Sequence, residues 1–201
     1  MQAFNFKSQL CAIALLLLSS VGASVQAATL SVNCGGIYGL TSINAALKVL
    51  QNSEEFHGPA TINVSGVCHE NVFIGSIDRL TLNAVNGASI THVGASDEVF
   101  SIYDSRGISI NNFTINGGGT VNGNGANGIG CYNLSVCRLS GNTVRGAGIG
   151  IVAEQAQLDV SGGTLRNNGT GLAIIQGSTA RVTDTSIQTT TGGLSLHSIR
   201  S

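Results

Sequence analysis

Three acidic residues, Asp97, Glu98 and Asp104, lie close together in a chain of 201 residues that has only ten Asp and Glu. Carboxylates gathered near a turn can act as a general base or bind Ca²⁺, which takes six to eight oxygen ligands. We therefore treat these residues as the candidate catalytic group, with Ca²⁺ as the one cofactor they could bind. The alternative is that all three lie in a solvated loop.

Two arginines with the same local sequence form a second candidate site. Arg145 and Arg166 lie 21 positions apart, and each follows a Thr and an apolar residue. Asn116 and Gln188 occupy the same place in two similar segments, so the four residues are expected to stack in one strip. Two like charges about 5 Å apart are unfavourable unless an anion or a carboxylate lies between them. Because the guanidinium group binds carboxylates through paired hydrogen bonds, the strip is a candidate binding site for acidic sugars.

Both groups belong to a repeat that must position them. Segments 110–115, 139–144, 160–165 and 182–187 align without gaps, at intervals of 29, 21 and 22 residues. Each is followed by a strand of the pattern Gly-apolar-x-apolar, and a loop rich in Gly and Asn at 117–127 accounts for about eight extra residues in the first interval. A unit this short, without a helix, buries its apolar face only by stacking on its neighbours.

The repeat predicts an all-β chain, a parallel β-helix of about six coils from residue 61 onward, with equivalent residues about 4.8 Å apart. A column of hydroxyl side chains, Thr114/Thr143/Thr164/Ser186, and a charge ladder, Arg138/Asp159/Arg181, are expected on its surface. The alternative is an antiparallel sandwich. That fold would not require the same type of side chain to recur at the same position in four successive units. The expected inward columns are Ile110/Leu139/Val160/Val182, Ile115/Val144/Leu165/Ile187, Ile129/Ile149/Leu172/Leu194 and Cys131/Ile151/Ile174/Leu196.

The two ends of this solenoid differ in sequence. A short amphipathic helix behind the N-cap candidates Thr41 and Ser42 is expected to cover the N-terminal end, because apolar residues recur there with helical spacing: Ile43, Ala46, Leu47 and Leu50. No similar segment follows the last repeat. The C-terminal coil is therefore expected either to continue in a longer protein or to self-associate edge to edge.

Residues 1–27 have the three parts of a secretory signal peptide, with Lys7, an apolar stretch and a small-residue region that ends at Ala27. We expect cleavage near Ala27 and a secreted or periplasmic protein. Membrane insertion is not expected, because the apolar stretch is shorter than the roughly 20 residues that a bilayer requires. The predicted organisation is a signal peptide at 1–27, an N-terminal strand and capping helix at 28–60, and β-helix repeats at 61–201.

Four cysteines follow the predicted signal peptide, and export permits disulfides. A bond between Cys34 and Cys68 would tie the N-terminal segment to the body of the chain. Cys131 and Cys137 fall at core-facing positions and are either bonded to each other or buried thiols. A zinc site is not expected, because no His and Cys pair has the spacing of a tetrahedral site.

Composition excludes several classes of protein. Nine Lys and Arg against ten Asp and Glu give a net charge of −1, without a basic stripe, so nucleic-acid binding is not expected. Disorder is excluded because Val, Ile and Leu are frequent. Aromatic residues make up only 4% of the chain, which argues against tight binding of neutral sugars. The four histidines belong to no nucleophile or metal motif: His57, His69, His92 and His197.

The opening segments resemble exported, right-handed parallel β-helix proteins of the pectate-lyase-like superfamily. The likeness covers residues 29–201 and lies in Cys34-Gly-Gly, Ser42-Ile-Asn-Ala-Ala-Leu, Gly66-Val-Cys-His-Glu-Asn-Val and Leu80-Thr-Leu-Asn-Ala-Val-Asn-Gly-Ala-Ser-Ile. It implies a right-handed β-helix with a short N-terminal capping helix. The superfamily includes lyases, polygalacturonases, pectin methylesterases, alginate epimerases, adhesins and non-catalytic members, so fold does not decide function.

The motifs of these enzymes are mostly absent. Gly66-Val-Cys-His-Glu70 is similar to the Gly-x-Tyr-x-Glu of pectin methylesterases, but Cys68 replaces the Tyr. The Asn-Thr-Asp and Gly-His-Gly of polygalacturonases and the Asp-Pro-His of alginate epimerases do not occur. We therefore expect a secreted protein that binds extracellular polysaccharide, with uronate-rich chains as partners. The alternatives are a polysaccharide lyase or glycoside hydrolase whose carboxylates meet only in three dimensions, and a structural or adhesin-like surface protein.

Overall fold

A computed structural model describes residues 27–52, 59–94, 98–119, 125–188 and 192–197. The strands form three stacks, named here sheets A, B and C. Sheet A contains β1 (Ala28–Cys34), β2 (Ala60–His69), β4 (Leu80–Ala84), β7 (Arg106–Asn111), β10 (Val136–Ser140), β13 (Gln157–Ser161) and β16 (Thr179–Thr183). Sheet B contains the end of β2, then β5 (Ser89–Thr91), β8 (Thr114–Asn116), β11 (Thr143–Arg145), β14 (Thr164–Arg166) and β17 (Ser186–Gln188). Sheet C contains β3 (Val72–Gly75), β6 (Glu98–Tyr103), β9 (Asn127–Tyr132), β12 (Ile149–Glu154), β15 (Thr170–Ile175) and β18 (Gly192–His197).

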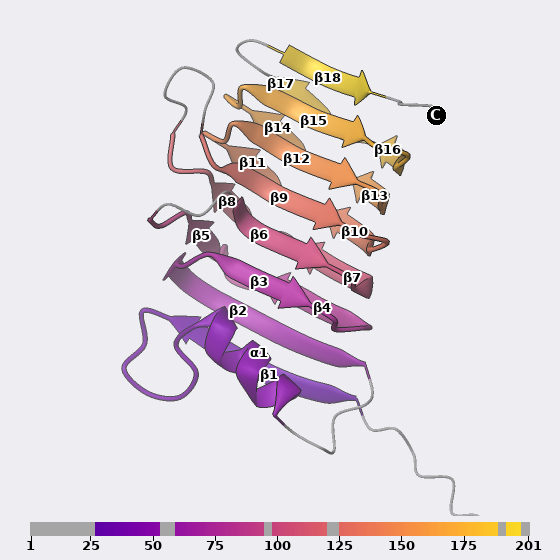
Figure 1. Ribbon diagram of the computed structural model, residues 1–201. Coiled ribbons are helices and arrows are strands. Elements are labelled where there is room, and N and C mark those ends of the chain that lie inside the picture. Colours follow the sequence, from indigo (N-terminus) through magenta and orange to yellow (C-terminus); the bar gives the residue numbers. More distant parts are fainter. Residues whose placement is uncertain (1–26, 53–58, 95–97, 120–124, 189–191, 198–201) are drawn as a thin grey trace, which may run out of the picture.

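The chain forms a parallel β-helix, as the repeat predicts. Successive strands visit sheets A, B and C in turn, and each pairs in parallel with its equivalent in the next coil. Sheets A and B are continuous through β2, which pairs with β4 along its first part and with β5 along its last. Sheet C has six strands, so six coils stack from β3 at one end to β18 at the other (Figure 1).

The strand register confirms the first two of the four predicted inward columns, and it also confirms the hydroxyl column. The third and fourth predicted columns are each wrong at one position, in the coil that contains β12. Ile151, and not Ile149, pairs with Ile129 and Leu172, and Ala153 takes the place predicted for Ile151. The reason is the corner between sheets B and C, which has the same length in successive coils. Val144 and Ile151 lie seven positions apart, as do Leu165 and Leu172. The loop before Ile129 is longer, so an alignment of the strands by local sequence does not give this register.

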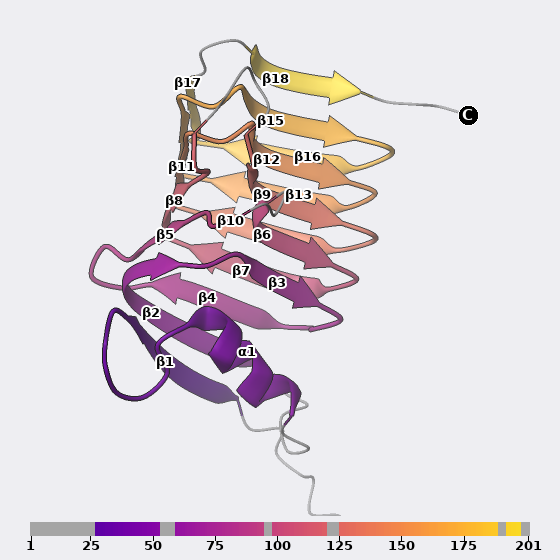
Figure 2. The same cartoon turned by 60° about the vertical axis from the view of Figure 1, so that its left-hand side comes forward.

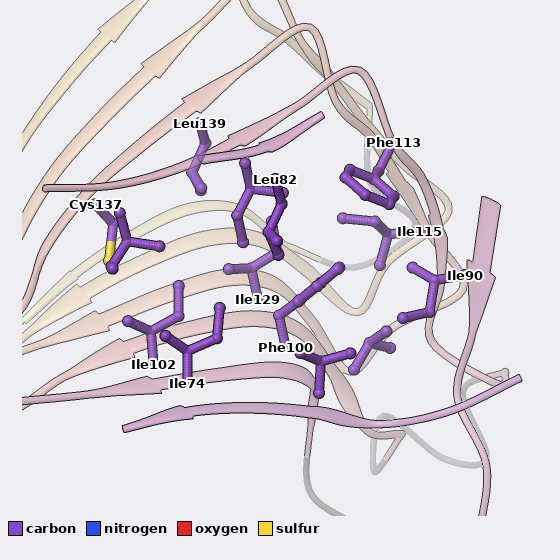
Figure 3. Close-up of a cluster of buried hydrophobic side chains, with 14 of the residues drawn as sticks. Ile74, Leu82, Ile90, Phe100, Ile102, Phe113, Ile115, Ile129, Cys137 and Leu139 are labelled. Atoms are coloured by element: carbon purple, nitrogen blue, oxygen red, sulfur yellow. The ribbon is translucent and has the colours of Figure 1, made fainter. Parts of the chain in front are cut away.

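Aliphatic side chains from all three sheets meet in the interior of the coil. Figure 3 shows Leu82 and Leu139 from sheet A, Ile90 and Ile115 from sheet B, and Ile74, Ile102 and Ile129 from sheet C pointing toward one another. Cys131 and Cys137 are also buried there and form a disulfide across the corner between sheets C and A. Burial decreases in the last coil, where Val182 is 40% exposed while its neighbour Val160 is 3% exposed.

Two-residue corners join sheet A to sheet B, and a buried asparagine stabilises one of them. The first residue of each corner has a positive φ, which Gly and Asn tolerate best: Asn112, Gly141, Gly162 and Asp184. The second residue of the corner after β10 is Asn142, which lies inside the coil. It accepts a hydrogen bond from the Phe113 N–H at 2.9 Å and donates one to the Ile110 carbonyl at 2.7 Å. One side chain therefore satisfies two buried backbone groups of the preceding coil.

The predicted capping helix is present as α1 (Ile43–Gln51), which packs against β1, β2 and β3 at the N-terminal end of the solenoid (Figure 2). Its buried residues are the four predicted ones: Ile43, Ala46, Leu47 and Leu50. Ser42 is the N-cap and accepts a hydrogen bond from the Ala45 N–H. The Glu70 carboxylate accepts the N–H groups of Ile43 at 2.7 Å and Asn44 at 3.1 Å, where a negative charge is favourable at a helix N-terminus.

A second link at this end is the disulfide between Cys34 and Cys68, which joins β1 to β2 as predicted.

The predicted signal peptide lies outside the described residues, apart from Ala27, and β1 begins directly after it at Ala28. Among the described residues, no helix is both long and apolar enough to cross a membrane.

Candidate functional site

The predicted strip of four polar residues forms one row on the outer face of sheet B. Arg145 pairs in register with Asn116 on one side and with Arg166 on the other, and Arg166 pairs with Gln188. Each is the last residue of its strand, and the row continues to Thr91 in β5. Adjacent strands lie about 4.8 Å apart, so the two arginines start from neighbouring backbone positions at that spacing, while the Arg145 side chain extends toward Asn116.

Hydrogen bonds within the row set the direction of the Arg145 side chain. The Nε–H group of Arg145 donates to Oδ1 of Asn116 at 2.6 Å, and Nδ2 of Asn116 donates to the Thr91 hydroxyl at 3.2 Å. The bond to Asn116 uses the Nε–H group of Arg145 and not its two Nη groups. Within the described part of the chain, neither Arg145 nor Arg166 forms an ion pair with a carboxylate.

A shallow hollow of about 320 Å³ lies next to Arg145, at the corner between sheets B and C. Three residues of the row, three glycines and Asn167 line it: Thr91, Asn116, Gly118, Gly119, Arg145, Gly146 and Asn167. Gly118, Gly119 and Gly146 have positive φ, which explains why glycine occupies this corner. The Gly119 N–H donates to the Gly146 carbonyl at 2.9 Å, so the two sides of the corner are bonded to each other.

The predicted acidic group is not brought together as one site by the described residues. Asp97 lies outside them. Glu98 begins β6 and Asp104 follows the last residue of that strand, so at about 3.3 Å per residue they lie roughly 20 Å apart. Asp104 is exposed at a corner. Neither a shared Ca²⁺ nor a joint acid and base function for Glu98 and Asp104 follows from this arrangement.

Glu98 is instead a buried carboxylate that holds a tyrosine. Its Oε1 accepts hydrogen bonds from the Tyr132 hydroxyl at 2.7 Å and from Nδ2 of Asn127 at 3.4 Å, and its Oε2 accepts one from the Ser101 hydroxyl at 2.8 Å. The Tyr132 ring lies across Gly130 of its own strand, where any side chain would overlap it. Since its hydrogen bonds are made inside the protein, Glu98 positions Tyr132 rather than facing a ligand.

Three aromatic residues, dispersed in the sequence, stack on the outer face of sheet C. Phe73 and Tyr103 have ring centroids 5.9 Å apart, and Tyr103 and Tyr132 have centroids 4.7 Å apart with planes inclined by 23°. Sequence reasoning missed this stack, although the spacing of 29 residues between Tyr103 and Tyr132 equals the first repeat interval. The Phe73 ring, at the end of the stack, is 59% exposed.

We expect Tyr132→Phe to lower the free energy of unfolding by about 1–3 kcal/mol, because Glu98 loses a donor in a buried place. Burial, followed by the hydrogen bond to Glu98, raises the pKa of Tyr132 above its ordinary value. The folded state therefore favours the neutral phenol. This contribution to stability is complete below pH 10 and is lost as the pH rises further.

Urea unfolding of both proteins at neutral and alkaline pH measures this effect. The stability difference between the native sequence and Tyr132→Phe should narrow above about pH 10, in step with tyrosinate absorbance on unfolding. A difference that stays constant across this range would contradict the assignment.

The outer face of sheet A carries the predicted charge ladder and an amide ladder. Asp159 pairs in register with Arg138 on one side and Arg181 on the other. Nearer the N-terminus, Asn63, Asn83 and Asn111 are bonded side chain to side chain, at 3.3 and 2.9 Å. The two arginines of this face resemble Arg145 and Arg166 in charge but have Asp159 between them.

The remaining candidate metal ligands that the structure describes do not form a metal site. Among the described residues, one set of potential ligands comes together, Cys34, Cys68 and Glu70, but its cysteines are bonded as a disulfide and Glu70 caps α1. Of the histidines, His69 is exposed and His92 is half-buried. His57 lies outside the described residues, and the side chain of His197 is not described.

In the part of the chain that the structure describes, sheet B therefore assembles the residues predicted for binding in one row beside a hollow. Comparison of the chain with protein-family models, with curated proteins and with solved structures finds no match, so the fold and this geometry carry the functional argument.

Proposed function

We propose that this chain is a secreted β-helix protein of the pectate-lyase-like type that binds acidic extracellular polysaccharide on the outer face of sheet B. The observation that carries the proposal is the pair Arg145 and Arg166, which are in register on adjacent strands without an ion pair to a described carboxylate. Two neighbouring cations are stabilised by an anion between them, and the planar guanidinium matches the geometry of a carboxylate.

The shape of the row supports an extended ligand. Asn116, Arg145, Arg166 and Gln188 follow one another along the solenoid axis, one residue per coil. A polymer with a carboxylate on successive sugar residues can contact both arginines at once, and its hydroxyl groups can bond the amides at either end. Binding at several such points increases the affinity for a polymer over that for a single sugar.

Export is part of the proposal. Both disulfides require an oxidising compartment, and the predicted signal peptide would direct the chain to one. Binding without cleavage is proposed because the row contains two arginines and two amides but no carboxylate that could act as a general acid or base.

The test is retention of the purified protein on immobilised polygalacturonate or alginate, with the variant Arg145→Ala/Arg166→Ala. We expect at least a tenfold loss of affinity, because charge-assisted contacts contribute about 1.5–3 kcal/mol each. Retention by the native sequence should also weaken as salt is added.

Arg138→Ala/Arg181→Ala is the matched control, since it removes the same charge from sheet A. It should bind as the native protein does. Equal losses in the two double variants would show that net charge, and not the row on sheet B, is responsible. Shortening of the polysaccharide during the incubation, with or without Ca²⁺, would overturn the proposal of binding without cleavage.

A further inference from the structure

We propose that the loop between β1 and α1 inserts its tip into the surface of a lipid bilayer. Residues 35–39, Gly-Gly-Ile-Tyr-Gly, form this loop and are named here the tip loop. It projects outward from the N-terminal end of the solenoid (Figures 1 and 2). The contact is peripheral and needs no membrane-spanning segment. It goes beyond the proposed function, because it uses apolar side chains that lie outside the row on sheet B.

The first support is the exposure of two adjacent apolar side chains. Ile37 is 84% exposed and Tyr38 is 86% exposed, more than any other large hydrophobic side chain that the structure describes. The next is Leu134, at 71%. Single exposed apolar residues are common on protein surfaces, whereas two neighbours at a projecting tip can enter the same apolar environment together.

The second support is the fixed base of the tip loop. Cys34, directly before the loop, is bonded to Cys68 in β2. The Asn33 N–H donates to the carbonyl of Leu40, directly after the loop, at 2.9 Å, and the Gly36 N–H donates to the Asn33 carbonyl at 3.0 Å. Because the base is already ordered, the two side chains at the tip lose little further conformational entropy when they bind.

The shape of the tip loop favours a fluid surface over a protein partner. At Gly35 and Gly39 φ is +108° and +77°, and a side chain added at either position would meet no atom within 4 Å apart from its chain neighbours. The flanks of the tip are therefore open, and the tip is convex. A convex tip can enter a lipid surface directly, whereas a protein partner must offer a pocket of matching shape.

The chemistry of the tip loop matches the interface of a neutral bilayer. Tyrosine is enriched at the level of lipid headgroups, because its ring is apolar and its hydroxyl is polar. An isoleucine side chain gains by leaving water. No Asp, Glu, Lys, Arg or His occurs from Ala28 to Leu47, so insertion desolvates no charged side chain of this segment. We therefore expect binding to zwitterionic lipid that does not depend on salt.

The strength of this contact follows from its small area. A myristoyl chain alone gives reversible membrane binding, with an association constant of about 10⁴ M⁻¹. Two side chains bury less apolar surface than that chain does. Binding should therefore be weak and reversible, with half saturation at millimolar lipid.

The first experiment uses fluorescence. The chain contains no Trp, so Tyr38→Trp places a single reporter at the tip. With phosphatidylcholine vesicles, its emission maximum should move to shorter wavelength, and brominated phosphatidylcholine should quench it. Leu134→Trp is the matched control, since it places the same reporter at an exposed apolar position between β9 and β10. It should show neither effect.

The second experiment measures sedimentation of the purified protein with the same vesicles. Ile37→Ser/Tyr38→Ser should lower the partition coefficient by about tenfold or more, because both apolar side chains are lost. Phe73→Ser, which removes an exposed apolar side chain from sheet C, should leave it unchanged.

Three results would overturn the proposal. They are the absence of binding by the native chain, equal spectral shifts in the two Trp variants, and equal losses of binding in the two Ser variants. A shift in Tyr38→Trp that grows with protein concentration without vesicles would show instead that a second copy of the chain covers the tip. Retention on polysaccharide should be unchanged in Ile37→Ser/Tyr38→Ser, so this proposal and the proposed function are tested separately.

Discussion

Replacing Asn142 by alanine is expected to lower the free energy of unfolding by about 3–5 kcal/mol, because two buried backbone groups lose the hydrogen bonds that this side chain forms with them. Asn142 lies inside the corner between β10 and β11, where its amide bonds the Phe113 N–H and the Ile110 carbonyl of the coil before. Each buried polar group left without a partner costs about 1–3 kcal/mol, and the cavity adds to this.

Asn111→Ala is the matched control. It also removes one asparagine side chain that bonds the neighbouring coil, but its amide lies on the outer face of sheet A and donates to Asn83 at 2.9 Å. Water can replace that bond, so the expected loss is about 1 kcal/mol. Urea unfolding of both variants measures the difference. Similar losses would mean that the Phe113 and Ile110 backbone groups find other partners.

Removing the disulfide between Cys34 and Cys68 is expected to have the second large effect, a loss of about 4 kcal/mol in the free energy of unfolding. The bond joins residues separated by 34 positions, whereas the bond between Cys131 and Cys137 joins residues separated by only six. Closing the longer loop removes more entropy from the unfolded chain, and the chain-entropy relation gives about 2 kcal/mol for the shorter one.

The paired variants Cys34→Ala/Cys68→Ala and Cys131→Ala/Cys137→Ala allow this comparison, with urea unfolding as the measurement. Hydrogen exchange should show where the loss is concentrated. Without the first bond, exchange should increase in β1 and α1, because these elements are tied to β2 by that disulfide, by strand pairing and by Glu70. A larger loss from the second pair would show that packing of the buried sulfur atoms outweighs loop closure.

The columns of side chains show how far the repeat can be read without a structure. Ile110, Leu139 and Val160 stack as predicted because each coil returns the chain to the same register. Ile149 was misplaced because the alignment matched Gly-Ile-Gly in two coils, while the geometry counts residues around a corner of constant length. When a loop of different length precedes a strand, the number of residues around the coil predicts the strand register better than local sequence similarity does.

The structure brings the predicted row at Arg145 together but not the predicted acidic group. The spacing of residues in a solenoid explains both results. Arg145 and Arg166 are far apart in sequence but meet because their separation equals one coil. Glu98 and Asp104 are near in sequence but lie at opposite ends of one extended strand. In a solenoid, separation by a whole repeat therefore predicts contact better than adjacency does.

The pattern of apolar residues was sufficient to predict the parallel coils, the capping helix and the row on sheet B, since burial and strand pairing act at fixed intervals along the chain. The hollow beside Arg145, the aromatic stack and the pairing of Cys131 with Cys137 were decided only in the tertiary structure. These features depend on corner conformations and side-chain directions. Such properties arise where the backbone turns and neighbouring coils come into contact, and a repeat interval alone, such as the 29 residues between Tyr103 and Tyr132, does not determine them.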